Sequence, residues 1–443
     1  MQVGSKSEYR LAASARQAHG RACQAAAGNP SQQLHLIGVA GSHGKTTTSC
    51  LIAGVLTAAG YRTGVLGTLG YLDGSRLEAA TESTPSPEQL AGLLARMVEN
   101  GCSHAVMEVS HQALAESRLA GVSLDAACVT QVAAESLDEH ASLRTSRAEK
   151  AKLFDHLTGE GFVVLNADDP GSASYVRELD GPALTIGIQS PAEITAVQIE
   201  ESISEQTFLL IAGTDSIPVR TEMIGVHHIY NCLTAAAVGL AYGIEVTTVV
   251  RGLESVGHVP GRLERIECGQ PFGVFVDHAR NPAALAGGLK CLRKVTEGRM
   301  VCVLGVGRQG SRASRQLMGR AAEQGADSTM VTYDTPHAPR PTPHAPRQDL
   351  PEAAGPTILS DVLSGFQDPN RGAVVEDRVE AIHRALDLAQ PGDCVLLAGQ
   401  AYDGARLEDR DSPPEDQEVA RRWLYDHAEA IATGPNFDRN TKN

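Results

Sequence analysis

The chain has 443 residues, which is too long for one compact core and predicts two or three domains. Its 38 Lys and Arg against 53 Asp and Glu give a net charge of −15, which excludes a nucleic-acid binder with a broadly cationic surface. No apolar run approaches the ~20 residues that cross a bilayer, so a membrane span is not expected either.

The first half of the chain alternates between strand and helix patterns. Residues 1–33 are rich in Ala and Gln and end at the break Gly28-Asn29-Pro30, so we expect an N-terminal tail. An apolar strand, a Gly-rich turn and a helix then follow in LHLIGVA, GSHGKTTT and SCLIAGVLTAAG. Further β-rich runs separated by helical stretches lie at 105–109, 126–130 and 162–166. We predict an α/β central domain over residues 34–258 with a parallel-rich sheet.

A Gly/Pro cluster at residues 257–261 predicts the boundary of a second domain, which we place at 259–432. Its β-rich runs alternate with helical stretches, as in a Rossmann-like α/β domain. These runs lie at 274–277, 300–305, 328–332, 373–376 and 394–398. Residues 335–347 repeat TPHAPR around one Pro and predict an exposed loop. We expect a C-terminal tail at 433–443.

The strongest chemical signal is the Gly-rich turn in GVAGSHGKTTT. Its glycines let backbone amides point into one concavity, while Lys45 can reach phosphate oxygens and Thr46 can offer its hydroxyl to Mg²⁺. The following helix adds its positive end. The strict GxxxxGK[ST] spacing is missed, because Val39 stands five residues before Gly44, and an incidental Gly-rich turn is the alternative. We predict a nucleotide phosphate loop formed by Gly41, Ser42, His43, Gly44, Lys45, Thr46 and Thr47.

Together with other motifs, this loop resembles the ATP loop of the Mur ligase family. The stretch TPSPEQLAGLLARMVENGCSHAVMEVS is similar to the branch that adds the third residue of the peptidoglycan stem peptide, usually meso-diaminopimelate or lysine. Matching motifs follow in the family's order: AEKAKLF, VLNADDP, GVHHIYNCLTAAA, VPGRLE, VDHARNPAAL, RQLMG and EDRVEAI. The resemblance covers most of residues 34–430 and implies ATP and Mg²⁺ as cofactors, with small-molecule carboxylate and amino-acid substrates.

Carried over by position, the resemblance makes Lys45 and Thr46 ligands of the ATP phosphates and of Mg²⁺. It makes Glu108 a metal ligand, since Mg²⁺ prefers hard oxygens, and Lys150 the lysine that carries a carbamate. The catalytic set is then Lys45, Lys150 and Glu108, with Thr46 and Glu108 as metal ligands. The alternatives are a surface carboxylate for Glu108 and a solvated helix lysine for Lys150.

Three further positions are carried over as nucleotide-binding residues. Asn231 is placed near the adenine, and Arg262 and Asp277 of the C-terminal domain face the nucleotide. The alternatives are a helix-capping or turn residue for Asn231, and partners in a salt bridge at the domain boundary for Arg262 and Asp277.

Several family positions are altered. TNLxxDHLDxHG is replaced by TQVAAESLDEHAS, where Ser136 takes the place of a metal-binding His, which puts a second Mg²⁺ site in doubt. The amino-acid-recognising Asp-Asn-Pro-Arg becomes Asp334-Thr335-Pro336-His337, and His cannot reproduce the bidentate fork of Arg. Diaminopimelate specificity therefore cannot be inferred. By this resemblance we expect no counterpart ahead of the loop to the family's first domain, which holds the UDP-sugar end of the substrate.

These observations favour an ADP-forming acid–amino-acid ligase that works through an acyl phosphate and belongs to peptidoglycan precursor synthesis. One alternative is a nucleotide-binding Mur-like protein that no longer ligates and regulates or partners a genuine ligase. Another is a ligase that extends folate with glutamate or polymerises amino acids. A partner ligase or a separate substrate-binding domain is conceivable in each case. The nine cysteines contain no CxxC pair, which signals neither zinc nor disulfides and favours the cytoplasm.

Overall fold

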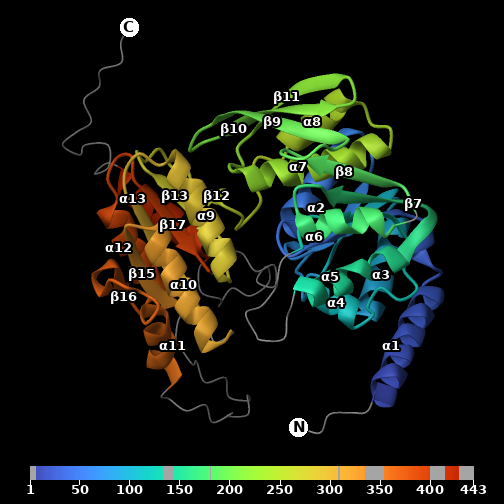
Figure 1. Cartoon of the computed structure of the whole chain (residues 1–443), viewed down its shortest axis with the longest axis horizontal. Helices are drawn as coiled ribbons and strands as arrows, with labels where there is room; N and C mark the ends of the chain where they lie inside the picture. Colours follow the sequence, from blue (N-terminus) through green and yellow to red (C-terminus); the bar gives the residue numbers. More distant parts are fainter. Residues whose placement is uncertain are drawn as a thin grey trace. The chain divides into compact units, whose positions relative to one another are not determined.

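The computed structural model describes residues 6–132, 143–179, 181–307, 310–334, 354–399 and 415–428. These residues group into two compact units, and the main change from the first to the second falls between Val259 and Pro260. Each unit is a sheet with helices packed on it (Figure 1), so the predicted α/β class is confirmed. No helix among these residues is long and apolar enough to span a membrane.

The first unit is built on one sheet of eleven strands. Its order is β11 (Asp215–Thr221), β10 (Gln206–Ala212), β9 (Ile194–Glu201), β8 (Ala183–Gly187), β7 (Leu157–Asn166), β6 (Leu124–Val129), β1 (His35–Ala40), β5 (His104–Val109), β2 (Thr63–Gly67), β3 (Gly70–Leu72) and β4 (Leu77–Glu78). The central strands from β9 to β2 are parallel, while β10, β11, β3 and β4 extend the sheet in antiparallel hairpins.

The register of the central strands positions the site. Ala40, the last residue of β1, is paired with Val109 at the end of β5 and with Val129 at the end of β6. The segments that leave these three strands therefore emerge together at the carboxyl edge of the sheet, where ligands bind in open α/β sheets.

Helices cover both faces of this sheet because alternate residues of a strand point to opposite faces. Ile37 and Val39 face a core shared with α2 (Lys45–Ala58), α7 (Val226–Ala241) and α8 (Val246–Glu254). Leu36 and Ala40 face the other core, shared with α3 (Pro87–Glu99), α4 (His111–Ala115) and the end of α5 (Leu143–Ala151). Shorter helical segments are α6 (Pro170–Ala173), η1 (Pro30–Gln32), η2 (Phe154–His156) and η3 (Ser174–Arg177).

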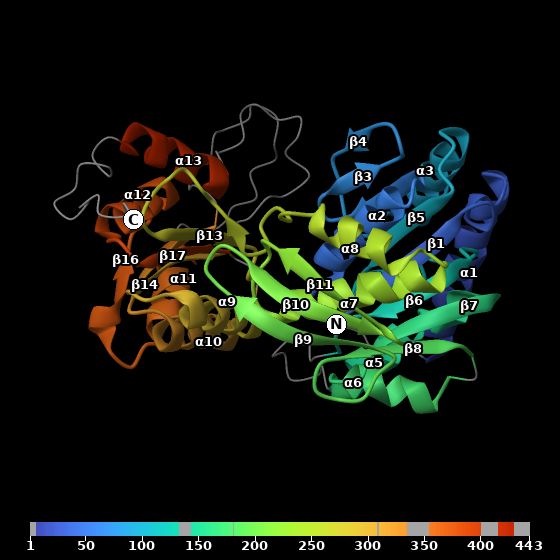
Figure 2. The ribbon, with the colours of Figure 1, turned by 90° about the horizontal axis from the view of Figure 1, so that it is seen from above.

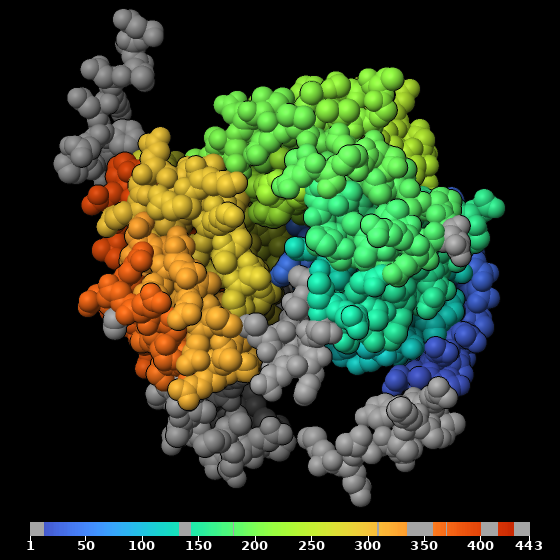
Figure 3. Space-filling view, viewed as in Figure 1, coloured from blue at the N-terminus to red at the C-terminus, as the bar shows by residue number. Residues whose placement is uncertain are grey.

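The segment that we expected to be a tail contains helix α1 (Lys6–Ala26), which contacts α3. Gly20 also lets α1 approach the segment after α4 closely, since a Cβ at this position would lie 2.8 Å from the carbonyl oxygen of Ala120. The helix ends before Asn29, whose backbone is left-handed at φ 53°. Helix α1 lies at the surface of the first unit, as Figure 3 shows in dark blue.

The second unit has a sheet of six strands with helices on both faces (Figure 2). The strand order is β12 (Glu264–Arg265), β13 (Gly273–Asp277), β17 (Cys394–Ala398), β14 (Met300–Val306), β15 (Ser328–Tyr333) and β16 (Gly372–Val374), all parallel except β12. One face carries α12 (Arg378–Leu388) and α13 (Asp416–Asp426). The other carries α9 (Pro282–Val295), α10 (Arg312–Gly325) and α11 (Ala354–Leu363), and η4 spans Pro369–Arg371.

The expected TPHAPR loop at 335–347 and the tail at 433–443 lie outside the described residues. Strands β8 to β11 and β2 to β4 were not predicted from the sequence. The strands predicted around 105–109, 126–130 and 162–166 are present as β5, β6 and β7, and those of the second domain as β13 to β17.

Candidate active site

The phosphate loop joins the end of β1 to the start of α2. Gly44 precedes the first residue of the helix with a left-handed backbone at φ 84°, and a Cβ there would lie 2.5 Å from Asn231 Oδ1. Gly41 has φ 149°, and a Cβ there would collide with the Thr130 hydroxyl. Both positions need glycine for their conformation and for the space around them.

The segment that follows β6 holds the loop in place. The Thr130 hydroxyl donates to the carbonyl oxygen of His43 at 2.5 Å, and the amide of Ser42 donates to the carbonyl of Gln131 at 2.8 Å. Lys45 Nζ lies 2.7 Å from the carbonyl oxygen of Gly41, to which it donates. The ammonium group is therefore positioned over its own loop at the helix N-terminus, where the helix dipole also favours an anion.

Glu108 lies on β5 beside this loop. Its Oε2 accepts hydrogen bonds from the hydroxyls of Thr46, at 3.0 Å, and Thr68, at 3.1 Å, while Oε1 accepts from the Thr68 amide at 2.8 Å. The Glu108 residue is only 2% exposed, so the alternative of a surface carboxylate is wrong. A Cβ on Gly67 would collide with this carboxylate, so glycine at the end of β2 leaves room for it.

The stretch Ser83-Thr84-Pro85 is attached to the same strand. The Thr84 hydroxyl donates to the Glu108 carbonyl oxygen at 2.9 Å and accepts from the Ser110 amide at 2.9 Å. Arg118 donates to the Thr84 carbonyl oxygen at 2.8 Å and forms an ion pair with Glu82. This segment is thus fixed at the end of β5 through its backbone and one hydroxyl.

Lys150 lies in α5 and is 1% exposed, which contradicts the alternative of a solvated helix lysine. Its Nζ donates to the Ser146 hydroxyl at 2.8 Å. Burial raises the pKa of Asp169, and the Lys150 charge opposes that shift, so the two groups interact. Asp169 in turn accepts from the amides of Val132, at 3.0 Å, and Ser172, at 2.7 Å, which joins the segments after β6 and β7.

Asn231 lies inside α7 and is 5% exposed. Its Oδ1 accepts from the Thr48 hydroxyl at 3.2 Å, and the same oxygen faces Gly44. Because Asn231 is five residues into the helix, the alternative of a capping or turn residue is wrong. Asn231 instead fastens α7 to the first turn of α2, next to the phosphate loop.

Arg262 and Asp277 belong to the second unit. Asp277 ends β13, and its Oδ2 accepts from the Leu263 amide at 2.8 Å. Burial raises the pKa of Asp277 to about 6, although the nearby Arg262 charge opposes this shift. The turn that carries Arg262 is held by the buried residue Glu264. Its carboxylate accepts hydrogen bonds from the Gly261 amide at 2.9 Å and from Arg421 at 3.0 Å.

A second group of charges lies at the carboxyl edge of the second sheet. Arg378 begins α12 and forms a buried ion pair with Asp416, and its guanidinium also donates to the Ala398 carbonyl oxygen at 3.2 Å. Burial raises the pKa of Asp334, with Arg378 and Arg280 opposing the shift. The altered positions Ser136 and His337 lie outside the described residues.

The structure therefore brings Gly41–Thr47, Glu108 and Asn231 into one site and places Lys150 beside Asp169 at the same edge of the sheet. Thr68, Thr130 and Asp169 were missed from the sequence. Each of them follows a strand end: β2, β6 and β7 respectively. Because carboxyl ends of parallel strands meet at one edge, this position was the available signal.

This donor set fits a nucleotide with Mg²⁺. The Glu108 carboxylate and the hydroxyls of Thr46 and Thr68 are hard oxygen ligands. Lys45 and the N-terminus of α2 place positive charge and backbone amides at the loop, which suits an anionic phosphate. The chain thus combines an α/β unit that carries a loop of the P-loop type with a second α/β unit, an arrangement suited to a nucleotide-binding enzyme.

Comparison with known proteins identifies the family. Residues 39–239 match the Mur ligase middle domain, and residues 261–401 match the Mur ligase glutamate ligase domain. The chain is 35% identical over 383 residues to the UDP-N-acetylmuramoyl-L-alanyl-D-glutamate–2,6-diaminopimelate ligase of Geobacillus thermodenitrificans, covering 85% of this chain and 76% of the relative. The Solibacter usitatus ligase of the same name is 34% identical over 415 residues, covering 92% and 81%.

Solved structures agree with this result. One of UDP-N-acetylmuramoyl-L-alanyl-D-glutamate–2,6-diaminopimelate ligase superposes with a TM-score of 0.62 and 25% identity, covering 89% of this chain and 79% of the other. The folylpolyglutamate synthase of Mycobacterium tuberculosis, at 20% identity and a TM-score of 0.68, shares the fold. The chain belongs to the Mur ligase family, and the predicted class of enzyme, a ligase that forms carbon–nitrogen bonds, is confirmed.

Proposed function

We propose that this chain is an ATP-dependent, ADP-forming ligase that joins a carboxylate of a peptidoglycan precursor to the amino group of an amino acid. The observation that carries the proposal is the buried Glu108 carboxylate, bonded to Thr46 and Thr68 beside the phosphate loop. ATP phosphorylates the carboxylate, and the amine then displaces phosphate, which leaves an amide, ADP and inorganic phosphate. The relatives named as 2,6-diaminopimelate ligases support this class.

Each residue of the loop has a task in this proposal. The amides of Gly41–Thr47 cradle the phosphates, and Lys45 pairs with their charge. Thr46 and Glu108 hold Mg²⁺, which when bound neutralises charge that develops on the transferred phosphoryl group. Asn231 lies next to the loop and contacts the nucleoside. The contribution of these groups is positioning and charge stabilisation.

Lys150 is the residue that we assign to carbamate formation. The Nζ ammonium loses one proton, the neutral amine attacks the carbon of carbon dioxide, and a second proton leaves the nitrogen, which gives an anionic carbamate that can bind a cation. Lys150 is among the most buried large side chains of the first unit, so its Nζ is shielded from bulk solvent. The proximity of Asp169 and Ser146 keeps its Nζ in a polar environment.

The second unit supplies Arg262 and Asp277 to the nucleotide and binds the amino acid. We leave the amino acid open, because His337 replaces the arginine that grips its carboxylate in the family. We place the reaction in the cytoplasm, where ATP is available. A second candidate function is favoured by His337 in place of the family's arginine and by Ser136 in place of its metal-binding histidine. It is that of a nucleotide-binding protein that regulates or partners a ligase without joining substrates itself.

Amine-dependent ADP release tests the proposal. Wild type is assayed with Mg²⁺-ATP against a panel of precursor carboxylates and amino acids, beside Lys45→Ala and the control Lys152→Ala, whose lysine is exposed and pairs with Glu149. We expect ADP release from wild type and the control and a loss of about 100-fold or more in Lys45→Ala. Equal rates in wild type and Lys45→Ala would overturn the enzymatic proposal, and tight ATP binding without release would favour the second candidate.

A further inference from the structure

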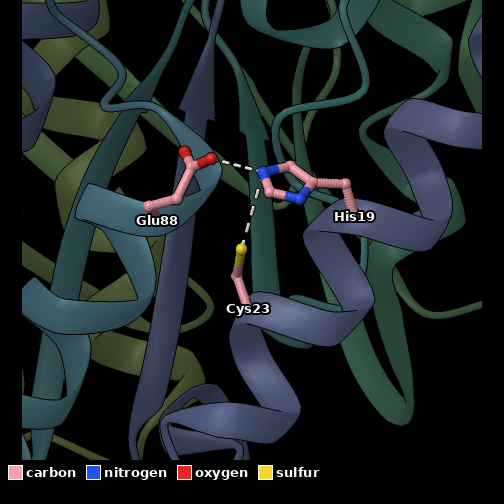
Figure 4. Close-up of side chains that lie close together, drawn as sticks. All are labelled: His19, Cys23 and Glu88. Carbon is pink, nitrogen blue, oxygen red and sulfur yellow. Dashed lines mark hydrogen bonds and ion pairs between the residues drawn. The ribbon is translucent and has the colours of Figure 1, made fainter.

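Three side chains with metal-binding atoms converge on the outer surface of the first unit, outside the phosphate site. His19 and Cys23 are four residues apart in α1 and so share one face of the helix. Glu88 is the second residue of α3. One nitrogen, sulfur or oxygen atom from each side chain lies within 4.8 Å of the other two. Figure 4 shows one ring nitrogen of His19 directed towards both the Cys23 thiol and the Glu88 carboxylate.

The contacts among these groups are polar. His19 Nε2 is hydrogen-bonded to Glu88 Oε1, and Cys23 Sγ lies 3.7 Å from the same nitrogen. The side chains of His19 and Glu88 are 54% and 59% exposed, and Cys23 is half-buried. Solvent and ions therefore reach the group.

Packing around the cluster fixes the two helices where they meet. Gly20 lies next to His19 and permits the close approach of α1 to Ala120. Gln24, next to Cys23, is 2% exposed. On the other helix, Ser86 caps the N-terminus by accepting from the Gln89 amide at 3.4 Å, and Pro87 occupies the first turn. The three donor groups thus project from backbone that is already held in place.

We propose that His19, Cys23 and Glu88 form a binding site for a zinc-type divalent cation. Thiolate, imidazole and carboxylate together are the donor set of Zn²⁺, whereas Mg²⁺ and Ca²⁺ prefer oxygen alone. Two ligands at i and i+4 on one helix are a recurrent chelating arrangement. Three protein ligands leave the fourth tetrahedral position open to water. Nothing in the proposed ligase reaction requires this ion, so the site is additional to it.

Binding has two consequences. It joins α1 to α3 through metal–ligand bonds, because His19 and Cys23 come from one helix and Glu88 from the other. It also releases a proton, since the metal binds the thiolate and expels the Cys23 S–H proton.

Zinc titration of the full chain, in competition with a chromogenic chelator and without nucleotide or Mg²⁺, tests the site. The variants are Cys23→Ser, His19→Gln and Glu88→Gln. The control is Cys268→Ser, which removes a half-buried cysteine of the second unit. We expect one high-affinity Zn²⁺ per chain, a loss of affinity of about tenfold or more in each ligand variant, and no change in the control.

Cobalt provides a second readout that reports the sulfur directly. Co²⁺ added to wild type and to Cys268→Ser should produce thiolate-to-metal charge-transfer absorption, which Cys23→Ser should lack. Circular dichroism verifies that each variant is folded. Zinc affinity in folded Cys23→Ser equal to wild type, or wild type that fails to compete with the chelator, would overturn the proposal. Neither result depends on ligase activity, so failure here is distinct from failure of the proposed function.

Discussion

The Glu108 carboxylate is the residue where burial and charge most directly constrain chemistry. All of its described side-chain partners are donors: the two hydroxyls and the amide of Thr46 and Thr68. Both carboxylate oxygens accept from neutral donors in a buried place, an environment that favours a bound cation. The charge is therefore the feature to remove, with the shape retained.

Replacing Glu108 with Gln removes the negative charge of this side chain and retains its shape. We expect kcat/KM for Mg²⁺-ATP to fall about 100-fold and the Mg²⁺ concentration for half-maximal activity to rise. Steady-state ADP release over a Mg²⁺ series measures both quantities. Glu160→Gln, which removes an exposed carboxylate of β7, is the control. The same Mg²⁺ dependence in Glu108→Gln and wild type would rule out a metal ligand at this position.

A buried histidine at the opposite edge of the first sheet makes the protein acid-sensitive. His104 begins β5 and lies among the rings of His35, Tyr61 and Tyr242. Burial, with the His35 charge, lowers the pKa of His104 to about 4, against the opposing charge of Asp125. Below the unfolded value of about 6.5 the unfolded chain takes up a proton that the folded chain rejects, so stability falls as pH decreases from about 6.5 towards 4.

The variant His104→Phe retains a ring and removes the titration. At pH 5 wild type should lose about 2 kcal/mol of unfolding free energy through His104 relative to pH 7, and His104→Phe should lose correspondingly less. Calorimetric unfolding of the first unit at several pH values between 5 and 7 measures the difference. Parallel pH curves for the two proteins would show that His104 titrates normally in the fold.

At the scale of elements, the phosphate loop depends on glycine for two separable reasons, backbone conformation and space. Gly44→Ala adds a methyl group at φ 84° and places it against Asn231 Oδ1. Gly60→Ala, just after α2, meets a similar backbone at φ 87° with no atom within 4 Å. Each substitution should cost about 1 kcal/mol of stability through the left-handed conformation.

The nucleotide then distinguishes the two positions. Gly44→Ala should weaken ATP binding about tenfold or more, because loop and Asn231 must move apart, whereas Gly60→Ala should bind ATP like wild type. Isothermal titration calorimetry with Mg²⁺-ATP gives both dissociation constants. If the two variants bind equally well, the close approach of Gly44 to Asn231 is not needed by the nucleotide site.

The elements that the sequence predicted are those whose signal is local. Strand β1, the loop and α2 are consecutive, so the apolar run, the glycines and Lys45 indicated both structure and chemistry. Strands β9 to β11 were missed because they bury apolar residues on one face only: Phe208 and Leu210 are fully buried, whereas Val197 and Ile199 are 54% and 60% exposed. Half-exposed antiparallel strands lack the continuous apolar runs of central parallel ones.

The site residues, like the strands, were predicted only where their signal is local in the sequence. Thr68 and Thr130 carry no motif of their own, and their roles arise because β2 and β6 end beside β1 and β5. His19 and Cys23 carried no metal signal in the sequence, because Glu88, the third donor, lies 69 residues from His19. Proximity that depends on sheet order or on helix packing cannot be inferred from spacing along the chain.

At the scale of the whole molecule, the division into two units predicts that nucleotide binding stabilises them unequally. The phosphate loop, Glu108 and Asn231 all belong to the first unit, whereas Arg262 and Asp277, which we propose as nucleotide contacts, belong to the second. A ligand that binds only the folded state stabilises the part that holds it, by about 2.7 kcal/mol when its concentration is 100 times its dissociation constant. We therefore expect a non-hydrolysable ATP analogue with Mg²⁺ to raise the unfolding temperature of the first unit more than that of the second.

Scanning calorimetry of the full chain measures this, and His104→Phe assigns the transitions, because its pH-dependent shift belongs to the first unit alone. Lys45→Ala should unfold at the same temperature with and without the analogue, since its phosphate contacts are lost. Two transitions that rise equally with nucleotide would mean that the second unit holds as much of the binding energy as the loop does. A rise confined to the first transition, and absent in Lys45→Ala, would instead place most of that energy at the carboxyl ends of β1 and β5, where the loop and Glu108 meet.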